Sequence, residues 1–357
     1  RMVGIGPDLR TLWFSKDSTL DVTLAPGFNE ALTLTFTQDK TALASLDALL
    51  IVFGEDTIDA VSGSGPDDAG NQSDWAIQPV HTDVGCINPR SVVVFLGGVL
   101  FESRIGISLL DRGLTTSWPG SRIQSTLATY PTITSAVLVA EEGEVRWTCD
   151  DGTNGIVLAY DYLRSHWFVR RYTDLADTST ASVRFVDAAL IDGVYTMLTA
   201  GGQVYRETDD NYYENGTDYV ERDILLAHIS AQPGRAGWVN DNLGWSRVKD
   251  LTLMGTATSD HDLEVSFAHD YGDFTQAKLF LAGSDVTAPL SANGLLEKAR
   301  ITCVRQKCQA IQIRLRDLEP TMTSGVSGGE GPVFEALLLR VGELDGGAAK
   351  TSPGQRG

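Results

Sequence analysis

Residues 92–101 read VVVFLGGVLF. Two runs of β-branched, aliphatic and aromatic residues flank a Gly-Gly pair. Such runs form strands, and glycine supplies the backbone conformations that a tight hairpin turn requires. Residues 49–61, 136–148 and 187–198 have the same construction. Because almost no apolar pattern follows the helical period, the sequence predicts an all-β fold.

The hairpins recur at a nearly constant spacing. One turn glycine from each segment follows the preceding one at intervals of 44, 45 and 50 residues: Gly54, Gly98, Gly143 and Gly193. A repeat of this length, with about four strands per unit, is typical of β-propeller blades, which bury their faces against neighbouring blades. Chance spacing of turns in another kind of all-β protein is the alternative. We expect four-stranded propeller blades over residues 1–222.

An aromatic residue stands early in the second strand of the last three hairpins. These residues are Phe101, Trp147 and Tyr195, and the first hairpin lacks a counterpart. Large rings at a repeated position bury much apolar area. We therefore predict that these three side chains anchor the packing between blades.

The repeat is lost after residue 222. Further strand candidates alternate apolar and polar residues, as at 263–267 and 311–315. This pattern indicates sheets that pack on one face. The sequence predicts a β-sandwich-like domain over residues 223–345, followed by a polar tail at 346–357.

Composition narrows the class of protein. Lys and Arg number 28 against 47 Asp and Glu, for a net charge of -19. Nucleic-acid affinity comes chiefly from cations that replace counterions on phosphates, so a conventional DNA-binding protein is excluded. No apolar run reaches the roughly 18 residues of a membrane span. The four cysteines are too few for a disulfide scaffold and are expected to be reduced and mostly buried; Cys303 and Cys308, five positions apart, would face opposite sides of one strand.

No motif for catalysis appears in the chain. The Ser-x-Asp-x-Gly-x-x-Trp order of sialidase-type propellers, a serine elbow, a Cys/His pair and a zinc-ligand spacing are all missing from the sequence. We therefore expect no enzyme activity, no cofactor and no bound metal. Residues 209–218 are rich in acids and could hold calcium, but their spacing departs from an EF-hand loop, and a solvated linker is the simpler interpretation.

One basic cluster contains aromatic residues. Arg164, His166, Arg170 and Arg171 surround Trp167 and Tyr172. Cationic and aromatic side chains together can stack on bases or bind an acidic partner. Ordinary packing and surface charge on the outer strands of a blade is the alternative.

Three stretches resemble the tail-nozzle, or tail-hub, proteins of short-tailed bacteriophages, which are also labelled stabilisation proteins. They are residues 91–107, residues 144–167, and residues 305–314 together with 334–342. The resemblance covers both predicted domains, and each of its motifs is degenerate. The N-terminal strands usual in the family are missing or shortened here, which leaves the closure of the ring of blades open.

The resemblance implies a structural role in the virion tail. It implies a homo-hexameric ring, assembled in the bacterial cytoplasm, that sits below the portal and adaptor and carries fibres or spikes at its side. Double-stranded DNA would pass through the lumen without sequence-specific binding. Two alternatives remain: a glycan-binding adhesin that uses Trp118, Trp147 and Trp167 as stacking platforms, and a capsule depolymerase that uses some of the many acids.

Overall fold

The computed structural model consists almost entirely of antiparallel strands. It describes residues 1–16, 28–67, 70–71, 73–172, 182–207, 213–214, 218–219, 222–226, 228–230, 246–257, 262–280, 295–303, 307–308, 310–318 and 332–342. The chain divides into two units, Arg1–Asp209 and Asp210–Gly357, so the division falls before the predicted boundary at residue 222.

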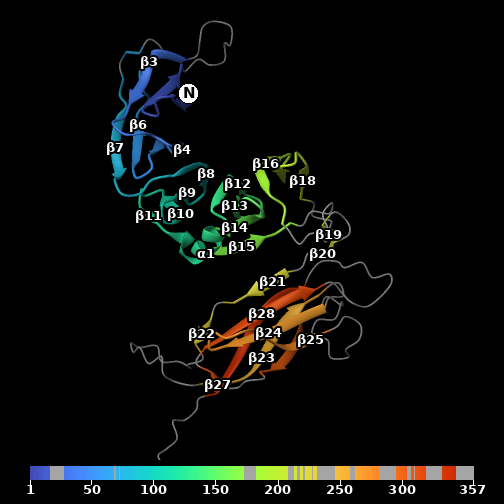
Figure 1. Ribbon diagram of the computed structural model, residues 1–357. Helices are drawn as coiled ribbons and strands as arrows, with labels where there is room; N and C mark the ends of the chain where they lie inside the picture. The colour runs from blue at the N-terminus through green and yellow to red at the C-terminus, as the bar shows by residue number, and fades with distance from the viewer. Residues whose placement is uncertain are drawn as a thin grey trace, which may run out of the picture. The chain divides into compact units, whose positions relative to one another are not determined.

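Among the described residues, the first unit contains five antiparallel sheets, numbered 1 to 5 here in chain order (Figure 1). Sheet 1 consists of β1 (Val3–Ile5), β2 (Thr11–Ser15) and β3 (Phe28–Thr35). Sheet 2 consists of β4 (Ala42–Leu46), β5 (Leu49–Phe53), β6 (Ile58–Ser62) and β7 (Ala76–His81). Sheet 3 consists of β8 (Asn88–Phe95), β9 (Gly98–Ser103), β10 (Gly106–Asp111) and β11 (Thr116–Ser117).

A short 3₁₀ helix (Pro119–Ile123) and helix α1 (Gln124–Thr129) follow β11, and the strand patterns did not predict either helix. Sheet 4 consists of β12 (Thr132–Val139), β13 (Glu144–Asp150), β14 (Gly155–Asp161) and β15 (His166–Arg170). Sheet 5 consists of β16 (Phe185–Ile191), β17 (Val194–Thr199) and β18 (Val204–Arg206). Each of the five sheets is a meander in which consecutive strands pair.

The interior sheets bury both faces, because successive side chains of a strand point to opposite sides. In β5, Ile51 and Phe53 pack into the core shared with sheet 3, whereas Val52 between them packs into the core shared with sheet 1. In β9, Phe101 packs toward sheet 2 and Leu100 toward sheet 4. A fourth core joins sheet 4 to sheet 5. This face-to-face stacking of four-stranded meanders is the construction of propeller blades.

The turn glycines are not all equivalent. Gly98, Gly143 and Gly193 lie at turns between the first and second strands of their sheets, but Gly54 lies between the second and third strands of sheet 2. The matching turn in sheet 2 contains Asp47, which has φ 52°. Aspartate tolerates this left-handed conformation, so a search for glycine misses the turn. Treating Gly54 as the counterpart of the other three glycines was therefore wrong.

The second unit is a sandwich of two antiparallel sheets, with the short pair β19 (Tyr213–Glu214) and β20 (Asp218–Tyr219) before it. One sheet has the order β21-β28-β24-β25, with β22 also paired to β28: β21 (Arg222–Leu225), β22 (Ile229–Ser230), β28 (Ala310–Leu318), β24 (Asp262–His269) and β25 (Thr275–Phe280). In the other, β23 (Ser246–Thr256) pairs with β26 (Glu297–Thr302), β27 (Lys307–Cys308) and β29 (Val333–Gly342).

One apolar core, centred on side chains such as Leu251, Phe267 and Ile313, joins the two sheets of the sandwich. The predicted fold class, all-β with four-stranded blades and a sandwich-like domain, is confirmed. No helix in the described part of the chain is long and apolar enough to cross a membrane.

The cysteines are all free and buried, as the sequence predicts. The expectation that Cys303 and Cys308 face opposite sides of one strand was wrong. Cys308 lies in β27 and Cys303 follows β26, and both thiols lie in the sandwich core. Burial raises the pKa of Cys86 to about 11 and that of Cys303 to about 12, so neither thiol is activated as a nucleophile.

Candidate functional site

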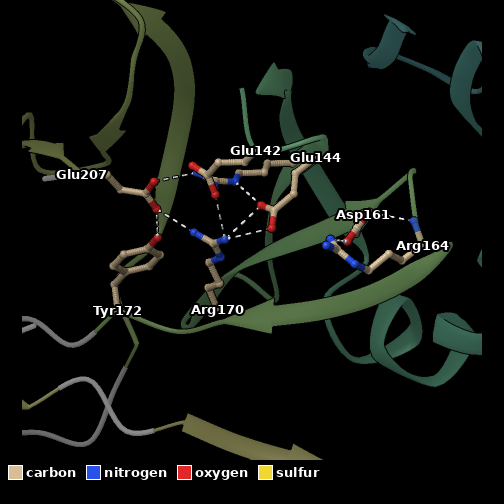
Figure 2. A network of polar contacts seen from close by, with 8 residues as sticks. Glu142, Glu144, Asp161, Arg164, Arg170, Tyr172 and Glu207 are labelled. Carbon is tan, nitrogen blue, oxygen red and sulfur yellow. Dashed lines mark hydrogen bonds and ion pairs between the residues drawn. The ribbon is translucent and has the colours of Figure 1, made fainter. Parts of the chain in front are cut away.

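A network of buried and half-buried charges lies between sheets 4 and 5 (Figure 2). Arg146 comes from the middle of β13 and Arg170 from the end of β15. Glu144 begins β13, Glu142 lies in the turn before it, and Glu207 follows β18. The network therefore connects the two sheets through side chains.

Arg146 is the centre of the network and has no exposed surface. Its Nε donates to Glu144 Oε2 at 2.8 Å, its Nη1 donates to Glu207 Oε2 at 2.6 Å, and its Nη2 donates to Glu142. The guanidinium also lies over the ring of Tyr195, with its carbon 4.8 Å from the ring centroid. A fully buried cation needs such partners because the desolvation of an unpaired charge is costly.

Arg170 forms a second layer on the same carboxylates. Its Nη2 donates to Glu144 Oε2 at 2.9 Å, and its Nη1 donates to Glu207 Oε1 at 3.1 Å. The Tyr172 hydroxyl donates to Glu207 Oε1 at 2.9 Å. Glu144 and Glu207 are thus each shared by two guanidiniums, as Figure 2 shows.

The pKa shifts of the network residues favour a structural role over acid–base catalysis. Burial raises the pKa of Glu207, but Arg146 and Arg170 lower it more, so the net pKa lies below its usual 4.5. Burial lowers the pKa of Arg146, and the surrounding carboxylates raise it more. Burial, with Glu207 adding to it, raises the pKa of Tyr172. A general acid needs a raised carboxyl pKa, whereas Glu207 is held ionised.

The predicted basic cluster divides into two parts. Arg170 and Tyr172 belong to the network, whereas Arg164 pairs with Asp161 at 2.8 Å, apart from the network (Figure 2). His166 is exposed, and its Nδ1 lies 2.7 Å from the Arg164 carbonyl oxygen. Arg171 is exposed. These side chains therefore do not form one basic surface.

Sequence reasoning found Arg170 and missed Arg146 and its carboxylates. Glu207 lies 61 residues from Arg146, and no local pattern relates the two. The available signal was Arg146 itself, a cation between Val145 and Trp147 in a strand that is buried along its whole length. Such a residue requires acidic partners from another element.

The three expected anchors lie between sheets. Phe101 is fully buried, with its ring centroid 4.8 Å from that of Phe53. Trp147 is fully buried, and its Nε1 donates to the Ser91 carbonyl oxygen at 3.0 Å. Tyr195 is buried in the core between sheets 4 and 5. Each ring points toward the sheet that precedes its own in the chain.

The three tryptophans of the glycan-binding alternative have different surroundings. Trp147 is fully buried. Trp167 is half-buried, and its Nε1 donates to the Pro119 carbonyl oxygen at 3.0 Å. Only Trp118 exposes about a third of its surface. These rings therefore do not present a shared stacking platform.

Within the described residues, no group of His, Cys, Asp and Glu could hold a metal ion. The acid-rich residues 209–218 lie mostly outside the described residues, and the side chains of the short strands within them are not described.

No model of a known protein family matches the chain, and no curated protein matches it. Among solved structures, it is similar to the computationally designed Ika4 protein at 15% identity, over 48% of this chain and 92% of that one, with a TM-score of 0.27. It is also similar to an exo-β-1,3-galactanase from Phanerochaete chrysosporium at 10% identity, over 95% of both chains, with a TM-score of 0.28. An arabinoxylan arabinofuranohydrolase of glycoside hydrolase family 43 from Bacillus subtilis matches at 9% identity, over 95% of this chain and 78% of that one, with a TM-score of 0.19. At these TM-scores the likenesses say nothing about activity.

Proposed function

We propose that this chain is a structural subunit of the tail nozzle of a short-tailed bacteriophage, and that it is not an enzyme. The observation that carries the structural role is the use of its buried charge. Arg146, Arg170 and Glu207 fasten one blade-like sheet to the next instead of being poised for proton transfer. The choice of a tail nozzle among structural proteins rests on the sequence resemblance in residues 91–107, 144–167, 305–314 and 334–342.

The charge of the chain is compatible with a conduit for DNA. Duplex DNA carries one negative charge per roughly 1.7 Å of axis, and proteins that hold it neutralise phosphates with Lys and Arg. A chain with a net charge of -19 repels the duplex on average. Under this proposal DNA slides past the subunits without being trapped.

The proposal includes an assembly. Six copies form a ring below the portal and adaptor of the virion, the ring retains the packaged genome until ejection, and fibres or spikes attach at its side. A ring of identical subunits is built from head-to-tail contacts that close by rotation.

Electron microscopy of purified particles tests the proposal. We expect six copies of the chain in a ring at the tail, labelled by an antibody against the purified protein. Absence of the protein from purified particles would refute the tail-nozzle proposal. Release of reducing ends from host capsule by the purified chain would instead support the depolymerase alternative.

A further inference from the structure

Backbone hydrogen bonds join sheet 5 to sheet 4 at one end. The Gly155 amide donates to the Ser182 carbonyl oxygen at 3.3 Å, and the Val183 amide donates to the Tyr172 carbonyl oxygen at 2.7 Å. In the part of the chain that the structure describes, these are the backbone hydrogen bonds between the two sheets. We call this end, where the chain enters sheet 5, the hinge end.

Two side chains strengthen the hinge end. The Thr134 hydroxyl donates to the Phe185 carbonyl oxygen at 2.9 Å, and Arg184 pairs with Asp150 at 3.3 Å. Asp150 ends β13, whereas Glu144 of the buried charge network begins it. A strand rises about 3.3 Å per residue, so these two positions on β13 lie roughly 20 Å apart. The hinge end and the charge network are therefore at opposite ends of the same strand.

The other end of sheet 5 is held by side chains among the described residues. Glu207 is the network carboxylate that sheet 5 contributes, and it accepts hydrogen bonds from Arg146 and Arg170 (Figure 2). The Glu207 amide donates to the Tyr195 carbonyl oxygen at 3.1 Å, which places both residues at this end. We call it the latch end. The Glu207 side chain is 25% exposed, so water reaches the contact.

Sheet 4 pairs its two guanidiniums without Glu207. Arg146 and Arg170 each pair with Glu142 and with Glu144, so two cations and two carboxylates balance within this sheet. Breaking a buried ion pair is most costly when it leaves a charge unpaired. Departure of Glu207 leaves both guanidiniums paired and moves the carboxylate into water. The latch therefore opens at a lower cost than an isolated buried ion pair.

The Tyr195 hydroxyl also favours separation at the latch end. It is buried and has no hydrogen-bond partner among the described residues. A polar group buried in this way regains a partner from water when the sheets part. The interface between sheets 3 and 4 differs, because the Trp147 Nε1 there donates to the Ser91 carbonyl oxygen.

We propose that sheet 5 is a hinged flap, in which residues 182–207 swing away from sheet 4 about the hinge end when Glu207 leaves the two guanidiniums. The strand ladders of β16, β17 and β18 stay within the flap. Proteins open in such cooperative units at free energies below that of global unfolding. The open state exposes Val139 and Val157 of sheet 4 together with Arg146. The flap is a property of the single chain and does not depend on the proposed function.

Thiol labelling of the full chain tests the flap. Val139→Cys places a thiol under the latch end, because Val139 pairs with Glu144, and Val157→Cys places one nearer the hinge, because Val157 pairs with Thr148. Both positions lie in the core between sheets 4 and 5. Cys149 is the internal control, since it lies in the core between sheets 3 and 4. By peptide mass spectrometry, the introduced thiol at position 139 should react fastest and Cys149 slowest.

Glu207→Gln releases the latch, because it removes the charge and keeps the size of the side chain. Labelling in Val139→Cys should then become faster by at least about tenfold, since hydrogen bonds from two guanidiniums lose their charged acceptor. The labelling rate of Cys149 should not change. Glu55→Gln is the matched control: Glu55 pairs with Arg104 at 2.9 Å, both side chains are exposed, and no labelling rate should change.

Three results would overturn the flap. Labelling of all three thiols at one common rate would show that the first unit opens only as a whole. Faster labelling at position 157 than at 139 would contradict the position of the hinge. A Glu207→Gln variant without effect, or with an equal effect on all three thiols, would show that Glu207 is not a latch. Thermal unfolding of each variant checks that it is folded, and Val137→Cys, at the same core, replaces Val139→Cys if that variant is destabilised.

Discussion

Replacing Arg146 with methionine should destabilise the first unit more than any change to its surface ion pairs. Methionine has a similar length and keeps contact with Tyr195, but it leaves Glu142, Glu144 and Glu207 without their central cation. Breaking a buried ion pair by removing one partner costs about 3–5 kcal/mol. We expect a loss of about 3 kcal/mol, the low end, because Arg170 still pairs with all three carboxylates and Glu142 is 46% exposed.

Urea unfolding followed by tryptophan fluorescence measures this loss. Arg112→Met is the matched control, because Arg112 and its partner Asp47 are both about half exposed and 3.3 Å apart. Such surface pairs contribute about 0–1 kcal/mol. The double variant Arg146→Met with Glu207→Gln should lose less than the sum of the two single variants, since removing the carboxylate relieves the charge left unpaired. If the loss of unfolding free energy in Arg146→Met is within about 0.5 kcal/mol of the loss in the control, the network does not hold sheets 4 and 5 together as inferred.

Other consequences are equally open to measurement. The pKa of Glu207 is lowered in the folded chain, so ionised Glu207 stabilises the fold above pH 4.5, and this stabilisation is lost as the pH falls through the folded pKa. The difference in free energy of unfolding between the wild type and Glu207→Gln should therefore shrink as the pH is lowered, as urea unfolding at a series of acid pH values would measure. Trp147→Ala should cost about 3–5 kcal/mol through the cavity between sheets 3 and 4, whereas Trp118→Ala, at a partly exposed ring, should cost clearly less; equal losses in urea unfolding would contradict the assigned packing. All four cysteines should resist a thiol-specific reagent in the native chain and react in urea, and rapid native labelling of Cys86, whose pKa burial raises to about 11, would show that its core opens readily.

The proposed structural role and the position of the charges are linked by the fold. In a stack of sheets, each interface has to be specific, because one flat apolar face fits many others. A buried ionic network adds this specificity, since Glu207 satisfies Arg146 only when sheet 5 takes one position against sheet 4. We therefore expect the Arg146 network to select the position of sheet 5 on sheet 4.

The sequence was sufficient to predict the hairpin strands and their alternation, but not the two short helices after β11. The stretch at residues 92–101 specifies β8, its turn and β9, because strand propensity and turn chemistry act between neighbouring residues. The division into a repeated part and a sandwich follows from the same local patterns, although the units divide near residue 209 instead of 222.

The tertiary structure decided which faces meet. Alternation shows that Arg146 and Trp147 point to opposite sides of β13, but it does not say which sheet lies on either side. Only packing places Trp147 against sheet 3 and brings Glu207 to Arg146 from 61 residues away. Local interactions determine the strands, whereas burial of their two faces depends on elements that are distant in the chain.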